Sequence, residues 1–228
     1  GRHTYSAYWV GLGGFSPDSS ALEQIGTEGD CTAQGGQIVN AWYELLPYAV
    51  PVSMSVRPGD TMTASVAVAG RRVTMTLADV TRNHSFTKVL TTNSVDVSSA
   101  EWIAEAPSQC FGQSTCTILP LAPFGSATFT AAVAQTANGH TGSIPDPAWG
   151  FTKLNLTPNG RGLVSIGAGG GIGAIASALH AGGSSFRVVY SRVTVQGSTA
   201  QLPGRRPRTA VAAAVGGAWP SVRVKPRR

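Results

Sequence analysis

The residues best suited to chemistry in this sequence are carboxyl groups in strand-like segments that otherwise hold few charges. Glu101 and Glu105 lie in Glu101-Trp-Ile-Ala-Glu105, where the alternation of a strand puts both side chains on one face. Glu44 shares a face with Trp42 in Ala41-Trp-Tyr-Glu44. A carboxyl group among apolar side chains resists ionisation, and a raised pKa suits general acid–base work. The same spacing also fits a glutamate on a solvated strand face, so spacing alone leaves both interpretations open.

The motifs of common hydrolases and metal enzymes are missing from the sequence. The histidines are scattered, and no His-Glu-x-x-His, Gly-x-Ser-x-Gly, Asp-Thr-Gly or Asp-Ser-Gly string occurs. The cysteines form no Cys-x-x-Cys pair with a histidine nearby, so no zinc site is expected. We expect neither a bound metal nor a cofactor.

One glycine-rich segment, Gly171-Ile-Gly-Ala-Ile-Ala176, fits the Gly-x-Gly-x-x-Ala pattern of dinucleotide sites. Such a site also needs an acidic residue about 20 positions further on. No acidic residue follows Asp146, and no alternation of strands and helices surrounds the segment. We therefore interpret it as a glycine-rich loop or as a short helix over residues 172–180.

Period-two alternation dominates the middle of the chain and predicts the scaffold for the carboxyl groups. Over residues 61–68 apolar side chains alternate with mostly hydroxyl-bearing ones, as in half-buried antiparallel strands. Turn signals such as Arg57-Pro-Gly-Asp60 and Asn138-Gly139 separate such segments. About ten strands with almost no helix predict an all-β fold, a two-sheet antiparallel β-sandwich. The predicted strands are 41–46, 52–56, 61–68, 73–77, 85–90, 101–104, 126–134, 151–157, 162–166 and 186–195.

The formal net charge of +6 is unevenly divided along the chain. Residues 1–196 hold 10 basic and 11 acidic residues, whereas residues 197–228 hold 7 basic residues and no acidic residue. Basic residues confined to a proline- and arginine-rich tail favour disorder over a nucleic-acid-binding face. We expect a β-sandwich domain over 1–196 and a disordered tail over 197–228. No apolar run reaches the roughly 18 residues of a membrane span.

Five blocks of residues occur in the order and spacing of one known family. They are Tyr8-Trp-Val-Gly-Leu-Gly-Gly14, Glu23-Gln-Ile-Gly26, Asn40-Ala-Trp-Tyr-Glu-Leu-Leu-Pro47, Pro58-Gly-Asp60 and Ser99-Ala-Glu-Trp-Ile-Ala-Glu105. On these blocks the chain resembles the glutamic peptidases, or eqolisins, and is similar to their scytalidoglutamic and aspergilloglutamic types. The likeness covers roughly residues 7–134, weakens towards residue 195 and is absent from the tail.

The resemblance implies a concanavalin- or lectin-like jelly roll and a secreted, extracellular acid endopeptidase. The family's catalytic pair falls on Gln24 and Glu105, and its substrate-binding tryptophan and glutamate fall on Trp9 and Glu44. Glu105 would act as general base and then as general acid, while the Gln24 amide would stabilise the tetrahedral intermediate. The implied partners are polypeptide substrates. We expect a monomer that binds neither nucleic acid nor a membrane.

The cysteines fit the resemblance in part. Cys110 and Cys116 enclose a turn-prone loop that a disulfide could close, and the family has a disulfide of this kind. Cys31 is then left alone. The family's equivalent thiol pairs with a cysteine before the Ala-Glu-Trp block, where this chain has none.

The chain also departs from the family pattern. Gly13 stands where the family has an aspartate, and Pro107 stands where it usually has an aromatic residue. The family's first strand, with an Asn-Trp-Gly-Gly element, would precede Trp9 and does not occur in this sequence. Two alternatives therefore stay open: a non-catalytic β-sandwich module that binds peptide or carbohydrate, and an inactive truncated homologue.

Overall fold

The computed structural model describes residues 1–16, 19–111, 115–156, 171–193 and 221–225. Over these ranges the chain forms strands and turns, and none of the described segments is a helix that could cross a membrane. The strands are β1 (Ala7–Gly13), β2 (Leu22–Cys31), β3 (Gln37–Leu45), β4 (Tyr48–Val52), β5 (Thr61–Ala69), β6 (Arg72–Asp79), β7 (His84–Thr91), β8 (Ala100–Glu105), β9 (Ser108–Phe111), β10 (Thr115–Ile118), β11 (Ser126–Thr130), β12 (Val133–Gln135), β13 (Thr141–Ser143), β14 (Gly171–Ala176), β15 (Phe186–Val193) and β16 (Ser221–Lys225).

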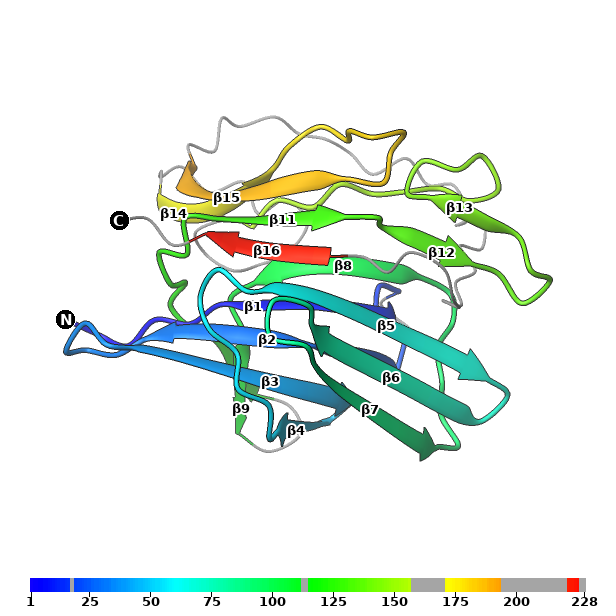
Figure 1. Cartoon of the computed structure of the whole chain (residues 1–228), viewed down its shortest axis with the longest axis horizontal. Coiled ribbons are helices and arrows are strands. Elements are labelled where there is room, and N and C mark those ends of the chain that lie inside the picture. Colours follow the sequence, from blue (N-terminus) through cyan, green and yellow to red (C-terminus); the bar gives the residue numbers. More distant parts are fainter. Residues whose placement is uncertain (17–18, 112–114, 157–170, 194–220, 226–228) are drawn as a thin grey trace.

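Two antiparallel sheets make up the body of the molecule (Figure 1). The smaller sheet has the order β4-β3-β2-β1-β8, and the larger has the order β14-β15-β11-β16-β5-β6-β7. The pairs β9-β10 and β12-β13 form separate two-stranded ribbons. The predicted all-β antiparallel sandwich is confirmed, and the five-stranded sheet carries the blocks that contain Gln24, Glu44 and Glu105.

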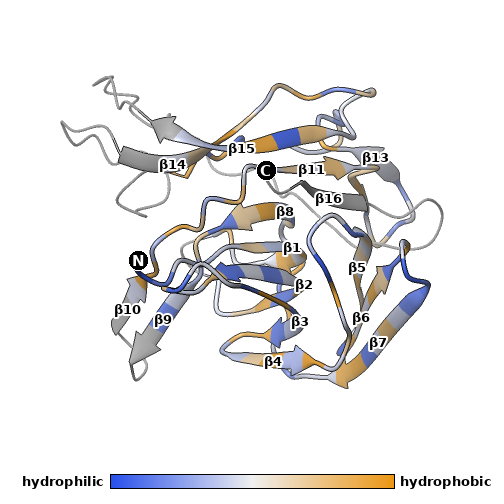
Figure 2. Cartoon of the chain, turned by 60° about the vertical axis from the view of Figure 1, so that its left-hand side comes forward, coloured by the Kyte–Doolittle hydropathy of each residue, from blue (hydrophilic) through white to orange (hydrophobic). Residues whose placement is uncertain are grey.

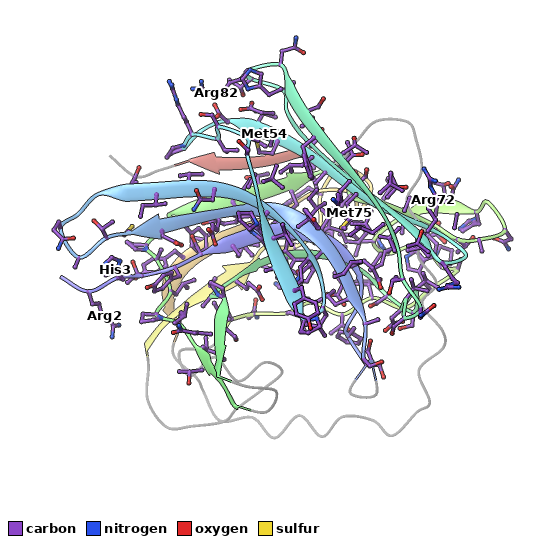
Figure 3. All side chains as sticks on the ribbon, turned by 90° about the horizontal axis from the view of Figure 1, so that it is seen from below. Arg2, His3, Met54, Arg72, Met75 and Arg82 are labelled. Atoms are coloured by element: carbon purple, nitrogen blue, oxygen red, sulfur yellow. The ribbon has the colours of Figure 1, made fainter. Side chains whose placement is uncertain are left out.

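Apolar side chains from both sheets fill the space between them. Met62, Val73, Met75 and Leu77 of the larger sheet are buried against a set from the smaller sheet that includes Ile25. Figure 3 places Met75 in the interior of the molecule, and Figure 2 shows β1–β4 stacked beside β5–β7. Alternation along each strand produces this core, because every second side chain faces the opposite sheet.

A second apolar cluster lies between β11, β14 and β15 of the larger sheet and the β1–β8 side of the smaller one. Phe129 and Phe186 stack with ring centroids 4.9 Å apart, and both are buried. Tyr8 of β1 meets Phe124 edge to face at 5.6 Å. These contacts hold β1 and β8 against the larger sheet, so one face of each strand is fixed in the core.

The glycine-rich segment is a strand, and its prediction as a loop or a short helix was wrong. Residues 171–176 form β14, which pairs with β15 along its whole length. Ala174 and Ala176 are buried, while Ile175 between them is 39% exposed. Small side chains on the inner face weakened the period-two signal, because alanine and glycine are compatible with strand, loop and helix alike.

Three further predicted strands differ from the structure. Only the first residue of 52–56 is in a strand, because pairing between β3 and β4 ends at Val52. The segment 126–134 is divided into β11 and β12, since Ala131 has a φ of 52° that interrupts the extended backbone. Over 151–156 only Leu156 is paired, in an isolated bridge to Ala174. The prediction for 162–166 lies outside the described residues.

Part of the C-terminal tail forms a strand of the larger sheet. Residues 221–225 form β16, drawn in red between β11 and β5 in Figure 1, and pair with both strands. This strand differs from the expected disorder of the tail, because its backbone groups complete the ladder between two neighbours. The rest of the tail lies outside the described residues, and the division into 1–196 and 197–228 stays a prediction.

Candidate active site

Three adjacent pairings place the candidate residues in rows across the five-stranded sheet. Gly11 of β1 is opposite Gln24 of β2 and Glu101 of β8, and Gln24 is opposite Glu44 of β3. Residues directly opposite one another in antiparallel strands point to the same side. Glu101, Gln24 and Glu44 therefore share one face of the sheet.

The next two rows extend this face. Trp9 is opposite Gly26 and Ile103, and Ala7 is opposite Glu105. Side chains two positions apart on a strand share a face, so Trp9 and Glu105 lie on the same side as the row of Gln24. The other side faces the core. Val10 and Ile25, which alternate with these residues, are buried in it.

Glu105 is held by a hydrogen bond from an indole. The Nε1–H of Trp9 donates to Oε1 of Glu105 over 3.0 Å. Burial raises the pKa of Glu105 to about 7, the indole hydrogen bond opposes this rise, and the nearby negative charge of Glu44 adds to it. A carboxyl group with such a pKa can both accept and donate a proton near neutral and mildly acidic pH.

Gln24 and Glu44 form the second pair. Gln24 is only 4% exposed, and its Nε2 donates to Oε2 of Glu44. Its Oε1 is buried and accepts no hydrogen bond from the described residues. Burial raises the pKa of Glu44, while the hydrogen bond from Gln24 acts in the opposite direction. Glu44 thus fixes the orientation of the amide, and one polar atom of Gln24 is left for another molecule.

Two glycines make room for Trp9 next to its neighbouring strands. A Cβ atom on Gly26 would be 2.1 Å from the backbone oxygen of Tyr8 and 2.7 Å from Cα of Trp9. A Cβ atom on Gly11 would be 2.9 Å from Cζ3 of Trp9. The Gly in Gln-Ile-Gly is therefore required by the close approach of β1 to β2, and that approach places the indole next to Gln24.

Glu101 adds a further carboxyl group to the face. The Ser99 hydroxyl donates to its Oε1 over 3.0 Å. Burial raises the pKa of Glu101 to about 7, and the charges of Glu105 and Asp96 also raise it. The sequence singled out Glu101 but did not place it in the site. Its place in the site depends on its position opposite Gly11. The sequence did not show this position, because the register between two strands cannot be derived from one strand alone.

Trp42 also lies on this face and was not assigned to the site from sequence. It is opposite Gly26, in the row of Trp9. Its indole Nε1 is buried and has no hydrogen-bond acceptor among the described residues. The alternation of Trp42 with Glu44 was the signal for this position.

A family model described as the Peptidase A4 family matches residues 1–168, which is more than half of the chain. The chain belongs to the peptidase A4 family. A comparison with curated proteins gives no match.

Solved structures of glutamic peptidases share the fold of this peptidase. Aspergilloglutamic peptidase from Aspergillus niger is 27% identical at a TM-score of 0.63, over 82% of this chain and 99% of that one. Scytalido-glutamic peptidase with a peptide-based transition-state analogue is 23% identical at a TM-score of 0.64, over 84% and 85%. SCP-B, an eqolisin solved with the tripeptide Ala-Ile-His, is 24% identical at a TM-score of 0.61, over 84% and 85%. Family and fold together identify this protein as a glutamic endopeptidase.

The turn after β1 in this peptidase has a carboxylate beside it although residue 13 is a glycine. Gly13 has a φ of 78°, and a Cβ atom there would lie 2.5 Å from Cβ of Asp96. The Asp96 carboxylate accepts hydrogen bonds from the backbone N–H of Gly14, at 3.3 Å, and from the Ser19 hydroxyl. Asp96 comes from the segment that leads into β8, so it connects the β1–β2 turn to the strand that carries Glu105.

The cysteines of this peptidase are only partly described. Cys110 and Cys116 are opposite one another in the β9–β10 ribbon, while the contacts of their side chains lie outside the described residues. The disulfide stays a prediction that this register supports. Cys31 is a free, partly buried thiol.

Among the described residues no group of three or more His, Cys, Asp or Glu side chains is arranged to hold a metal ion. The polar groups on the face are carboxyl, amide and indole, and these groups alone can transfer protons and stabilise an oxyanion.

Proposed function

We propose that the protein is an acid endopeptidase in which Glu105 is the general base and acid and Gln24 stabilises the tetrahedral intermediate. The observation that carries this proposal is the shared face of neighbouring strands. Glu105 is hydrogen-bonded by Trp9 and Gln24 is hydrogen-bonded to Glu44, and Glu44 is close enough to act on the pKa of Glu105.

The first step is the attack of water on the scissile carbonyl group. Ionised Glu105 accepts a proton from the water molecule while the water oxygen bonds to the carbonyl carbon. The electron pair of the C=O π bond moves to the carbonyl oxygen, which becomes an oxyanion. Burial favours this step, because the desolvated carboxylate is a stronger base than one in water.

Gln24 is suited to the developing charge. A side-chain amide has two N–H donors and one carbonyl acceptor. One N–H is directed to Glu44, which leaves the second N–H for the oxyanion and the unpartnered Oε1 for the attacking water. One donor aimed at a developing oxyanion contributes roughly 100- to 1000-fold in rate in other hydrolases.

The second step is departure of the amine. Glu105, now protonated, donates its proton to the peptide nitrogen as the C–N bond breaks. The electron pair of that bond stays on nitrogen, and the oxyanion re-forms a C=O bond. The products are a carboxylic acid and an amine, and Glu105 returns to its ionised form.

Acid conditions suit this face because the carboxyl groups of Glu44, Glu101 and Glu105 lie on it. Burial raises the pKa of Glu44 and of Glu101, so both hold protons more firmly than ordinary glutamates do. When Glu44 and Glu101 are neutral, they do not oppose the oxyanion, and the charge of Glu105 is lost as it accepts a proton from water. When both are ionised, their charges oppose oxyanion formation. We therefore propose greater activity in mildly acidic solution, where part of Glu105 is still ionised, than above neutral pH.

The proposal includes a polypeptide substrate, secretion and a monomeric state. The tripeptide in the SCP-B structure supports the substrate class. The opposed positions of Cys110 and Cys116 support an oxidising compartment, where disulfides persist. Recovery of the mature chain from culture medium tests secretion, and retention of the chain inside the cell contradicts it.

The test of the proposal is gelatin hydrolysis measured from about pH 4 to about pH 7, the acid side of the pKa of Glu105, where a fraction of Glu105 is ionised. The proposal requires cleavage in the presence of pepstatin and of a chelator, since it uses neither paired catalytic aspartates nor a metal. Cleavage abolished by either inhibitor refutes the mechanism. Retention of peptides without turnover would instead identify a binding module.

A further inference from the structure

Two aspartates are buried together at one end of the larger sheet, whereas the active-site strands belong to the smaller sheet. Asp60 comes immediately before β5, and Asp79 is the last residue of β6. Asp79 pairs with Met62, two residues after Asp60, so the sheet register brings the two carboxyl groups together. Asp60 is 6% exposed and Asp79 is 1% exposed. Burial of two acidic groups at one place requires a compensating arrangement.

The hydrogen bonds of the pair leave one buried carboxyl oxygen, Oδ2 of Asp79, without a partner among the described residues. Oδ2 of Asp60 accepts from the backbone N–H of Arg57 at 2.8 Å and from Nε of Arg82 at 2.9 Å. Oδ1 of Asp79 accepts from the backbone N–H of Arg82 at 3.1 Å. Oδ2 of Asp79 is buried and receives no hydrogen bond from the described residues. Nε of Arg82 is 3.7 Å from it, beyond hydrogen-bonding distance.

The charges of the cluster do not balance if both acids are ionised. Arg82 is the cationic side chain of the cluster, and it comes from the β6–β7 turn, at the periphery of the molecule in Figure 3. Two carboxylates and one guanidinium would leave a buried negative charge and an unpartnered oxygen, a combination that is strongly destabilising. A proton on Asp79 removes both problems, because its O–H can donate to Asp60 while Arg82 balances the remaining charge.

We propose that Asp60 and Asp79 share one proton in the folded protein, and that this pair makes the β5–β6–β7 end of the larger sheet more stable in acid than above neutral pH. The two side chains are within hydrogen-bonding reach of each other. Around the pair, Arg82 contributes its side chain, Arg57 contributes only its backbone N–H, and His84, opposite Asp79 in β7, has an exposed side chain.

The two members of the pair shift in opposite directions, as proton sharing requires. Burial and the neighbouring Asp60 raise the pKa of Asp79. For Asp60, burial also acts upward, but hydrogen bonds from Arg57, Arg82 and Asp79 outweigh it and lower its pKa.

Linkage between protonation and folding then gives the pH range of greatest stability. A raised folded pKa stabilises the fold at low pH, and this contribution is lost as pH rises through that pKa. A lowered folded pKa stabilises the fold above the ordinary aspartate range, and this contribution is lost as pH falls through the lowered value. The pair is therefore most stabilising between the lowered pKa of Asp60 and the raised pKa of Asp79.

The test is thermal unfolding of the full chain and of Asp79→Asn at about pH 4 and about pH 8, on either side of the range in which buried acids titrate. The asparagine amide donates to Asp60 at every pH and so imitates the protonated acid. We expect similar midpoints in acid, and a midpoint for Asp79→Asn at least about 2 °C above that of the unchanged protein at the higher pH. If the unfolding midpoints of both proteins fall by the same amount between the lower and the higher pH, the proposal is overturned.

Asp146→Asn is the control, because the Asp146 carboxyl group hydrogen-bonds to exposed His140 and not to another acid. It should show the same fall with pH as the unchanged protein. Glu23, whose buried carboxyl group has a pKa of about 7, contributes equally to all three proteins and cancels in the comparison. If Asp79→Asn does not fold, ¹³C NMR of labelled aspartate carboxyl groups decides. Asp30 also has a raised pKa, of about 6, so the spectra are recorded on Asp30→Asn. In that variant, one aspartate carboxyl group that stays protonated to well above the ordinary aspartate pKa of about 4 supports the pair, and titration of every aspartate near that value overturns it.

Discussion

Removal of the indole donor next to Glu105 changes the pH at which the site works. In Trp9→Phe the aromatic packing over Gly11 and Gly26 is largely kept, but the 3.0 Å hydrogen bond from Nε1 to Glu105 is lost. That bond lowers the pKa of Glu105 against the effect of burial. Its removal therefore raises this pKa, and the ionised base becomes scarcer in acid.

The size of the effect follows from the strength of the bond. A hydrogen bond to a charged group contributes about 1.5–3 kcal/mol, and one pH unit corresponds to about 1.4 kcal/mol. The acidic limb of the kcat/KM profile should move up by about one to two pH units, with a roughly tenfold loss per unit on that limb. The rate on the plateau should change much less, because Gln24 and Glu44 keep their contact.

The assay is cleavage of a fluorogenic peptide at closely spaced pH values. Trp149→Phe is the matched control, since the Trp149 indole also donates over 3.0 Å, to the backbone oxygen of Ile144 in a different part of the fold. Its acidic limb should coincide with that of the unchanged enzyme. An unshifted limb in Trp9→Phe, with activity retained, would refute the role given to the indole.

Two other substitutions separate charge from packing. Glu44→Gln removes the charge that raises the pKa of Glu105 and keeps an acceptor for Gln24. The acidic limb of the kcat/KM profile should therefore move to lower pH, opposite to the shift in Trp9→Phe. A shift to higher pH in the same assay contradicts this expectation. Gly26→Ala places a Cβ atom 2.1 Å from a backbone oxygen, whereas Gly150→Ala meets nothing within 4 Å. Denaturant unfolding should show a free energy of unfolding lower by about 3 kcal/mol or more for Gly26→Ala and little changed for Gly150→Ala. Equal stabilities of the two variants would show that β1 and β2 can move apart without cost.

Period-two alternation predicts which residues of one strand share a face, and this part of the site was predictable from sequence. Glu101 and Glu105 do share a face, as do Trp42 and Glu44. The connection between these two groups was not predictable from alternation, because it depends on which strands are neighbours and on their register. The row from Glu101 through Gly11 and Gln24 to Glu44 exists only after β8, β1, β2 and β3 have paired.

Other parts of the fold were hidden by composition. β1 is buried on both faces, so its sequence shows no alternation of apolar and polar residues. β14 was missed for the related reason that alanine and glycine carry little pattern, although Ile175 does face outwards. β16 lies in a segment whose arginines and prolines indicate disorder, and it is a strand because β11 and β5 offer unpaired backbone on both sides.

The most direct test of the catalytic assignment is peptide hydrolysis by Glu105→Gln at about pH 6, within about one unit of the pKa of Glu105. Acid–base groups of this kind typically contribute roughly 100- to 10,000-fold. Asp30→Asn is the control, because Asp30 is a carboxyl group of the same sheet with a pKa of about 6 that lies six residues along β2 from Gln24 and accepts a hydrogen bond from the backbone N–H of Ser6. Glu105→Gln should lose at least about 100-fold in kcat with an unchanged circular dichroism spectrum, while Asp30→Asn stays active. Hydrolysis by a folded Glu105→Gln at the rate of the control would contradict the account.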